Sequence, residues 1–191
     1  FHIDLGELLG RAIKPHEEKG ILKDEGSKII GEIIEFFKGR FKNVLLDKKY
    51  DYYIIDAVLE TELKDLHDAY LRIQELSKWK AKEGFEDIIT SFNRVSNLAS
   101  KWDELCHELL VREELLKDAD EKALYELYED INNKFLLFIK EKDYNQALSS
   151  LISMKAPIDK FFDNVMVMVE DEELRNNRLS ILKSISLMMN E

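Results

Sequence analysis

The chain has 191 residues, of which 45% are hydrophobic and 35% charged, a balance typical of a soluble globular protein and not of a disordered one. Its formal net charge of −11 argues against indiscriminate binding to nucleic acid, and the single cysteine, Cys106, excludes an internal disulfide. No apolar run approaches the roughly 20 residues of a membrane-spanning helix, so we expect a cytoplasmic protein with no membrane partner.

Helices are predicted along the whole chain. All seven glycines lie at or before Gly84, and the 107 residues after it contain one proline, Pro157. Strand-and-turn proteins need glycine at their turns, so this half should be helical. Apolar residues recur at three- and four-residue steps, as on the buried face of a helix. In chain order, the predicted helices cover 4–13, 25–46, 51–59, 62–79, 84–105, 119–141, 143–153, 157–168 and 171–189.

This pattern predicts an all-α protein without a sheet. A soft boundary falls near residues 80–84, which divides the chain into a helical connecting region, 1–80, and a helical bundle, 81–191. Pro157 suits the first turn of a helix, where its missing N–H costs nothing. Asp171 suits the N-cap of the last helix. Met166 and Met168, which alternate with valines, are expected in the core or at a helix end.

Acidic residues are concentrated in the second half of the chain. Residues 1–80 hold 14 bases and 16 acids, whereas residues 81–191 hold 14 bases and 23 acids. Within that half, residues 103–130 alone carry a net charge of −8. An anionic ligand must therefore bind a local basic face while the acidic stretches point elsewhere.

Motifs for catalysis or cofactor binding are missing from the sequence. No phosphate-binding glycine-rich motif occurs, and His2, His16, His67 and His107 form no zinc-type pair with Cys106. The dipeptide His67-Asp68 resembles metal-dependent phosphohydrolases, but the further ligands of such a site are not found. We therefore expect a helical module without metal or cofactor.

The most distinctive candidate binding face lies within residues 88–102, which hold two bases and no acid. On a helix, Thr90, Arg94, Asn97 and Lys101 share one face, away from the apolar one. These donors suit contacts with phosphates and base edges. The alternative is an ordinary solvated face.

Three further groups of cations are weaker candidates. Lys38, Arg40, Lys42, Lys48 and Lys49 precede Tyr50, Tyr52 and Tyr53, and bases interleaved with aromatics suit single-stranded RNA, although these tyrosines could equally pack into a core. A cluster of Lys78, Trp79, Lys80 and Lys82 is best explained as a solvated helix end. Arg175 and Arg178 are candidates on the last helix, unless they pair with the acids before them.

Several segments resemble the beta chain of bacterial glycyl-tRNA synthetases. Residues 52–59, YYIIDAVL, are similar to the family's YDVIDAVLA, and residues 92–99, FNRVSNLA, to its KRVSNILA. Residues 121–125, EKALY, and the long run 156–179 from APIDKFFDNVMVM to EDEELRNNRL also resemble family segments. The matches keep their order over nearly the whole chain. Because the chain begins at Phe1 and not at methionine, we expect a C-terminal piece of such a subunit.

The resemblance implies a fold and a function. The bundle would be an anticodon-binding domain of the DALR type with an N-terminal helical extension. It would bind glycine tRNA, and not DNA, in an enzyme of two alpha and two beta chains, whose alpha chain uses ATP and Mg. The chain itself would then hold no catalytic residue. The rival interpretation is a protein-interaction bundle without an RNA role, supported by the net charge and the acidic residues 103–130.

Overall fold

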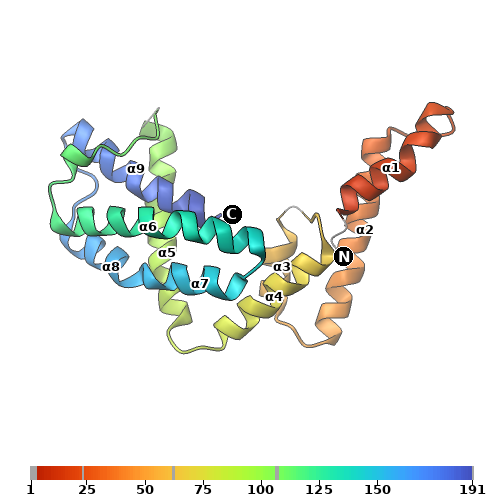
Figure 1. Ribbon diagram of the computed structural model, residues 1–191, viewed down its shortest axis with the longest axis horizontal. Helices are drawn as coiled ribbons and strands as arrows, with labels where there is room; N and C mark the ends of the chain where they lie inside the picture. Colours follow the sequence, from red (N-terminus) through yellow and green to blue (C-terminus); the bar gives the residue numbers. More distant parts are fainter. Residues whose placement is uncertain (1–3, 23, 62, 106–107, 191) are drawn as a thin grey trace. The chain divides into compact units, whose positions relative to one another are not determined.

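A computed structural model describes residues 4–22, 24–61, 63–105 and 108–190, and within these ranges it contains helices and no strand (Figure 1). The all-helical prediction is therefore confirmed for the described residues. The chain divides into two compact units, Phe1–Ala81 and Lys82–Glu191.

Three of the four helices of the first unit begin at aspartates that cap them; the second helix begins after Glu25, which makes no side-chain cap. Asp4, Asp51 and Asp65 each accept a hydrogen bond from a backbone N–H in the first turn of the following helix, at 2.8–2.9 Å. Such caps satisfy amide groups that have no partner within the helix. The unit consists of α1 (Leu5–Glu18), α2 (Gly26–Asp47), α3 (Tyr52–Leu59) and α4 (Leu66–Lys80).

A small core joins three of these helices. Leu45 of α2, Ile55 of α3 and Ile73 of α4 are almost fully buried in one cluster. α1 packs on α2, and the backbone N–H of Leu5 donates to the carbonyl of Lys64 at 2.8 Å, which ties the start of α1 to the loop before α4. The first unit is thus held by the C-terminal end of α2 and the two short helices after it.

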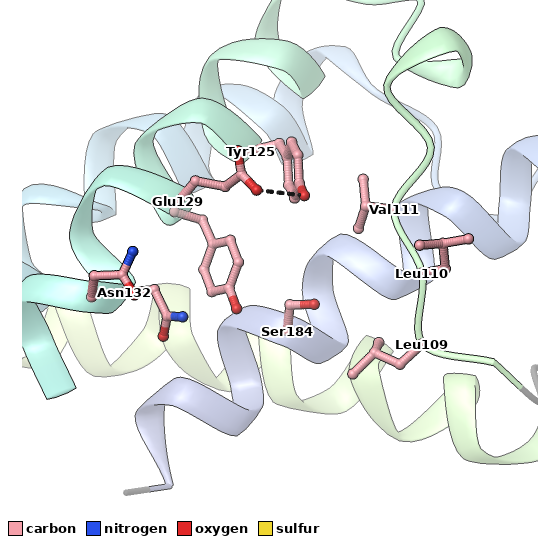
Figure 2. A pocket seen from close by; sticks show the side chains of 9 residues that line it. Leu109, Leu110, Val111, Tyr125, Glu129, Asn132 and Ser184 are labelled. Atoms are coloured by element: carbon pink, nitrogen blue, oxygen red, sulfur yellow. Dashed lines mark hydrogen bonds between the residues drawn. The ribbon is translucent and has the colours of Figure 1, made fainter.

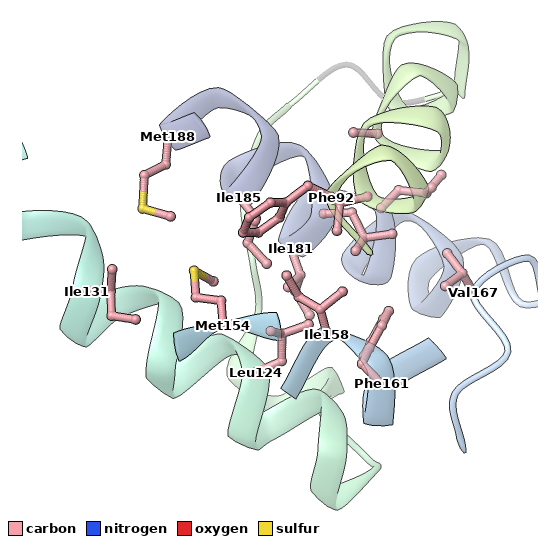
Figure 3. Packing of buried hydrophobic residues seen from close by; sticks show 14 of the residues in the cluster. Phe92, Leu124, Ile131, Met154, Ile158, Phe161, Val167, Ile181, Ile185 and Met188 are labelled. Carbon is pink, nitrogen blue, oxygen red and sulfur yellow. The ribbon is translucent and has the colours of Figure 1, made fainter. Parts of the chain in front are cut away.

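The second unit is a bundle around its last helix. Six consecutive residues of α9, from Asn177 to Leu182, are buried, so this helix is covered on all sides. Figure 3 shows Ile181 and Ile185 of α9 packed with Phe92, Ile158 and Phe161. The unit consists of α5 (Phe85–Leu105), a 3-10 turn η1 (Glu113–Leu115), α6 (Ala119–Glu141), α7 (Tyr144–Ser153), α8 (Lys155–Asn164) and α9 (Glu172–Met189).

An ion pair lies inside this core. Glu121 is fully buried in the first turn of α6, and one of its carboxylate oxygens accepts from Nε of Arg178 on α9. The other oxygen accepts from the backbone N–H groups of Lys117 and Asp118, at 3.1 and 3.0 Å, as half of a capping box. Nη1 of Arg178 also donates to the carbonyl of Met166 at 2.7 Å. Four hydrogen bonds therefore compensate for removing both charges from water.

Three predicted helices have wrong bounds. The first helix continues through Pro15 to Glu18, and the helix expected over 62–79 begins at Leu66. The helix expected over 157–168 begins at Lys155 and ends at Asn164. After Asn164 the chain is extended. Successive side chains of an extended segment point to opposite sides, so Val165 and Val167 are buried in the core while Met166 is 72% exposed. The core alternative for Met166 and Met168 was therefore wrong: both are exposed just after the end of α8, and Val165 and Val167 belong to the core. Pro157 lies in the first turn of α8, as predicted.

We expect Glu121→Ala to lower the free energy of unfolding by about 3–5 kcal/mol, because it leaves the Arg178 charge buried without its partner. Urea unfolding followed by circular dichroism measures this loss. Glu126→Ala, on the exposed side of the same helix, is the matched control and should stay within about 0.5 kcal/mol of the parent. Equal stabilities for the two variants would contradict a structural role of the pair.

Candidate nucleic-acid interface

The predicted donor face exists on α5. Thr90, Arg94, Asn97 and Lys101 are all exposed, whereas Phe92 and Val95 on the opposite side of the helix are buried in the core. Because the buried side is locked by packing against α8 and α9, the exposed donors stand on a rigid element. The predicted geometry of this face is confirmed, and its role in binding stays a prediction.

Arg94 is held in place by α8. Its guanidinium lies over the ring of Phe162, 4.4 Å from the centroid. The neighbouring Asp159 accepts hydrogen bonds from the hydroxyl of Ser91 at 2.6 Å and from Nζ of Lys155 at 2.7 Å. Stacking on a ring orients a guanidinium while its N–H groups stay at the edge. Arg94 is thus an exposed, oriented donor, and neither Phe162 nor Asp159 was recognised from the sequence as its support.

Asp159 is ionised through its partners. Burial by itself raises the pKa of the carboxyl, but the hydrogen bonds from Lys155 and Ser91 and the charges of Lys155 and Arg94 outweigh it and hold the pKa below its usual range. The negative charge persists at neutral pH and attracts the Arg94 guanidinium toward α8. Asp159 of α8 thus binds Ser91 of α5 and Lys155 of its own helix. These contacts hold α8 against α5 next to Arg94.

Lys101 is less available than the sequence predicted. Its Nζ lies 3.1 and 3.2 Å from the two carboxylate oxygens of Glu104, one turn further along α5. Residues 88–102 hold no acid, but Glu104, just beyond them, reaches back to Lys101 on the same face. The ion pair is exposed and weak, but Glu104 offsets the positive charge that a phosphate would meet at Lys101.

The two arginines of α9 differ in exposure. Arg178 is buried against Glu121, so its inclusion among the tRNA-binding candidates was wrong. The suggested pairing with the preceding acids was also wrong for Arg178, since its partner lies on α6. Arg175 does face a preceding acid: its Nη2 lies 3.6 Å from Glu172, and its side chain is partly exposed. A role of Arg175 in tRNA binding stays a prediction.

The basic stretch of the first unit is largely paired. Lys38 lies 3.0 Å from Glu35, and Lys42 donates to Asp56, whose pKa is held below its usual range first of all by that hydrogen bond. Arg40 lies over the ring of Phe36 at 5.9 Å. In the third cluster, Lys78 pairs with Glu75 and Lys80 with Asp51. These cations form a mixed-charge surface and not a purely basic one.

The aromatic residues of this unit divide into two groups. Tyr50 is half-buried against Tyr70, with 6.0 Å between ring centroids, as the core interpretation predicted. Tyr52 and Tyr53 are exposed, Tyr53 by 78%, and Nζ of Lys42 lies over the Tyr52 ring at 4.1 Å. Phe36, 64% exposed beside Arg40, was missed by the sequence analysis. The adjacent aromatic pair Phe36-Phe37 on an amphipathic helix could have indicated an exposed apolar side chain.

Other kinds of site receive no support from the described residues. No group of three or more histidine, cysteine, aspartate or glutamate side chains among them is arranged to hold a metal ion. His2, Cys106 and His107 lie outside the described residues. A search of the described helices finds none long and apolar enough to cross a membrane.

A domain family described as the DALR anticodon binding domain matches residues 88–191, more than half of the chain. The chain belongs to this family. The match begins in α5, three residues after the helix starts, and covers the helices after it. The face of Arg94, Asn97 and Lys101 therefore lies inside the DALR domain, whereas the basic stretch from Lys38 to Lys49 lies outside it.

Proteins named glycine–tRNA ligase beta subunit are similar to nearly the whole chain, as the sequence resemblance predicted. The one from Clostridioides difficile is 34% identical over 183 residues, 96% of this chain and 26% of that protein. Those from Persephonella marina and Syntrophomonas wolfei are 40% and 39% identical, over 90% and 98% of this chain and 24% and 27% of theirs. The chain thus spans about a quarter of the length of the relatives it matches.

We expect Asp159→Asn to destabilise the DALR domain at neutral pH and not in acid. A carboxyl whose folded pKa is depressed contributes stability above its unfolded pKa, about 3.9, and loses it as the pH falls through the lower folded value. Urea unfolding of parent and variant at pH 6 and pH 3 measures this difference. A difference that is the same at both pH values would show that charge at Asp159 contributes nothing.

Proposed function

We propose that this chain is the tRNA-binding, anticodon-recognising part of the beta subunit of a bacterial glycine–tRNA ligase, and that it supports glycyl-tRNA formation in the cytoplasm. The observation that carries the proposal is the DALR anticodon binding domain over residues 88–191, within a chain whose relatives are beta subunits of that ligase. The partners would be glycine tRNA and the alpha subunit, in an assembly of two alpha and two beta chains.

The α5 face supplies suitable chemistry for this role. Glycine codons begin with two guanines, so glycine anticodons share two cytosines. Cytosine presents the acceptors N3 and O2 beside an amino donor on its pairing edge, and arginine, asparagine or lysine can donate to those acceptors. Arg94, backed by Phe162, presents N–H groups in a fixed plane, which is what reading a base edge requires.

A comparison of two tRNAs tests the proposal most directly. We expect the chain to bind glycine tRNA in a filter-binding assay more tightly than a tRNA whose anticodon cytosines are replaced. Binding should weaken as salt rises, since protein cations displace counterions from phosphates. If neither tRNA binds at low salt, the protein-interaction interpretation replaces this one.

Arg94→Ala distinguishes base reading from phosphate contact. If Arg94 reads a base, the variant should lose about 1–3 kcal/mol of binding and discriminate less between the two tRNAs. If it contacts phosphate, both tRNAs should lose equally and the salt slope should shrink by about one unit. We expect the first result, because contact with the Phe162 ring restricts where the guanidinium can lie.

Two further variants control this experiment. Lys101→Ala should weaken both tRNAs alike and by less than Arg94→Ala, because Glu104 already offsets the Lys101 charge. Glu126→Ala, on α6, should change neither measurement. If Arg94→Ala and Lys101→Ala fold and bind like the parent, the α5 face is solvated surface, and the basic stretch from Lys38 to Lys49 becomes the better candidate.

We propose that the chain has no catalytic centre and needs no cofactor, and that ATP and Mg act in the alpha chain. The purified chain should therefore show no glycine-dependent exchange of pyrophosphate into ATP. The same assay with the alpha and beta subunits combined is the positive control. Exchange above background by the chain alone would overturn this part of the proposal.

A further inference from the structure

A cavity of about 320 Å³ opens in the second unit between an extended segment and two helices (Figure 2). One wall is the segment 109–111, which follows α5 and leads toward η1. The facing wall is α6, with Tyr125, Tyr128 and Glu129, and Ser184 of α9 completes the lining together with two asparagines of α6. The cavity uses none of the residues of the Arg94 face.

The α6 wall combines aromatic faces with a carboxylate. The rings of Tyr125 and Tyr128 stack, with centroids 6.2 Å apart and 27° between their planes. The Tyr125 hydroxyl donates to Glu129 at 2.8 Å. Burial, followed by that hydrogen bond, raises the pKa of Tyr125 to about 12, so the hydroxyl remains a donor and the ring remains neutral at physiological pH. Glu129 is exposed at the rim and can accept further hydrogen bonds.

Charge around the cavity selects against RNA. No lysine or arginine is among the residues that line it, and Glu129 is its charged residue. Residues 103–130, which supply most of its surroundings, have a net charge of −8. A phosphate backbone would be repelled here, whereas a cation gains from the carboxylate and from the tyrosine faces.

A second cavity, of about 310 Å³, lies on the other side of Leu110. Glu108, Glu172 and Glu173 line it against a single cation, Arg112. Asn176 also lines this cavity. Leu110, 52% exposed, is common to both cavities. This surface therefore offers acceptors and an apolar ridge, and it needs donors.

We propose that this surface docks a polypeptide segment that inserts an arginine side chain into the cavity of Tyr125, Tyr128 and Glu129 and lays an apolar residue on Leu110. Arginine fits better than lysine, because a planar guanidinium can lie along a tyrosine face and pair with a carboxylate in the same plane. The exposed leucine supplies the apolar contact that distinguishes a protein partner from a simple cation. The surface is separate from the proposed tRNA face, so the two proposals stand independently.

Short peptides test the proposal with the 191-residue chain. The probe is acetyl-Leu-Arg-Leu-amide, and the matched probe carries citrulline, an uncharged near-isostere, in place of arginine. Ring NMR signals of ¹³C-labelled tyrosine report on the cavity once Tyr125→Phe and Tyr128→Phe have assigned them. We expect the arginine peptide to shift both signals saturably and the citrulline peptide to bind about tenfold more weakly, as loss of a charge-assisted contact implies.

Two variants and one RNA probe complete the experiment. Glu129→Gln should weaken the arginine peptide about tenfold, whereas Glu126→Gln, about one turn away on α6 and not part of the cavity lining, should leave it unchanged. A tetracytidylate oligonucleotide should not shift the two tyrosine signals. Equal binding of the two peptides, no binding of either, or a shift caused by the oligonucleotide and not by the arginine peptide would each overturn the proposal.

Discussion

The buried pair of Glu121 and Arg178 is the constraint on which the second unit depends. It joins the first turn of α6, the middle of α9 and the extended residues after α8, which are far apart in the sequence. Because Glu121 also accepts two backbone N–H groups, the pair fixes where α6 begins and how it lies against α9. Asn177, the neighbour of Arg178, exchanges hydrogen bonds with the backbone of Arg112 and holds the segment before η1 in the same way. The start of α6 and the segment before η1 are therefore both held by neighbouring residues in one turn of α9.

This arrangement accounts for the segments in which the chain resembles its relatives. Residues 121–125 and 170–179 contain the two partners of the buried pair, and residues 156–168 contain the carbonyl that Arg178 also binds. Each of those segments therefore contributes to the core. The short Phe92–Ala99 segment differs, since its buried residues support α5 while Arg94 and Asn97 face solvent. Resemblance to the family does not distinguish residues that build the core from residues that face solvent, whereas burial in the structure does.

Helix positions could be predicted because apolar spacing and capping aspartates are local properties, and they placed α2, α3, α5, α6 and α9 within a residue at each end. The end of α8 could not, because the alternation of Val165 to Met168 reports a contact with the distant core and not a local preference. The donor face of α5 was found from spacing, yet the burial of Arg178 was not, since its partner is 57 residues away. Sequence analysis assigns charged residues to the surface, because they are rarely buried. A buried arginine that pairs with a distant glutamate is an exception that the neighbouring sequence does not reveal.

The opposite signs of two surfaces make the proposed RNA face compatible with so acidic a domain. On α5, the acids of the first turn and Glu104 bracket the exposed donors, while Asp159 lies beneath Arg94 and is occupied by Lys155 and Ser91. Other acids lie along α6 and near Leu110, where Glu129 lines one cavity and Glu108 lines the other. Electrostatic screening over about 8–10 Å at physiological salt lets such neighbouring faces act separately. Net charge therefore limits where the proposed RNA binding could take place on this domain, and does not by itself exclude it.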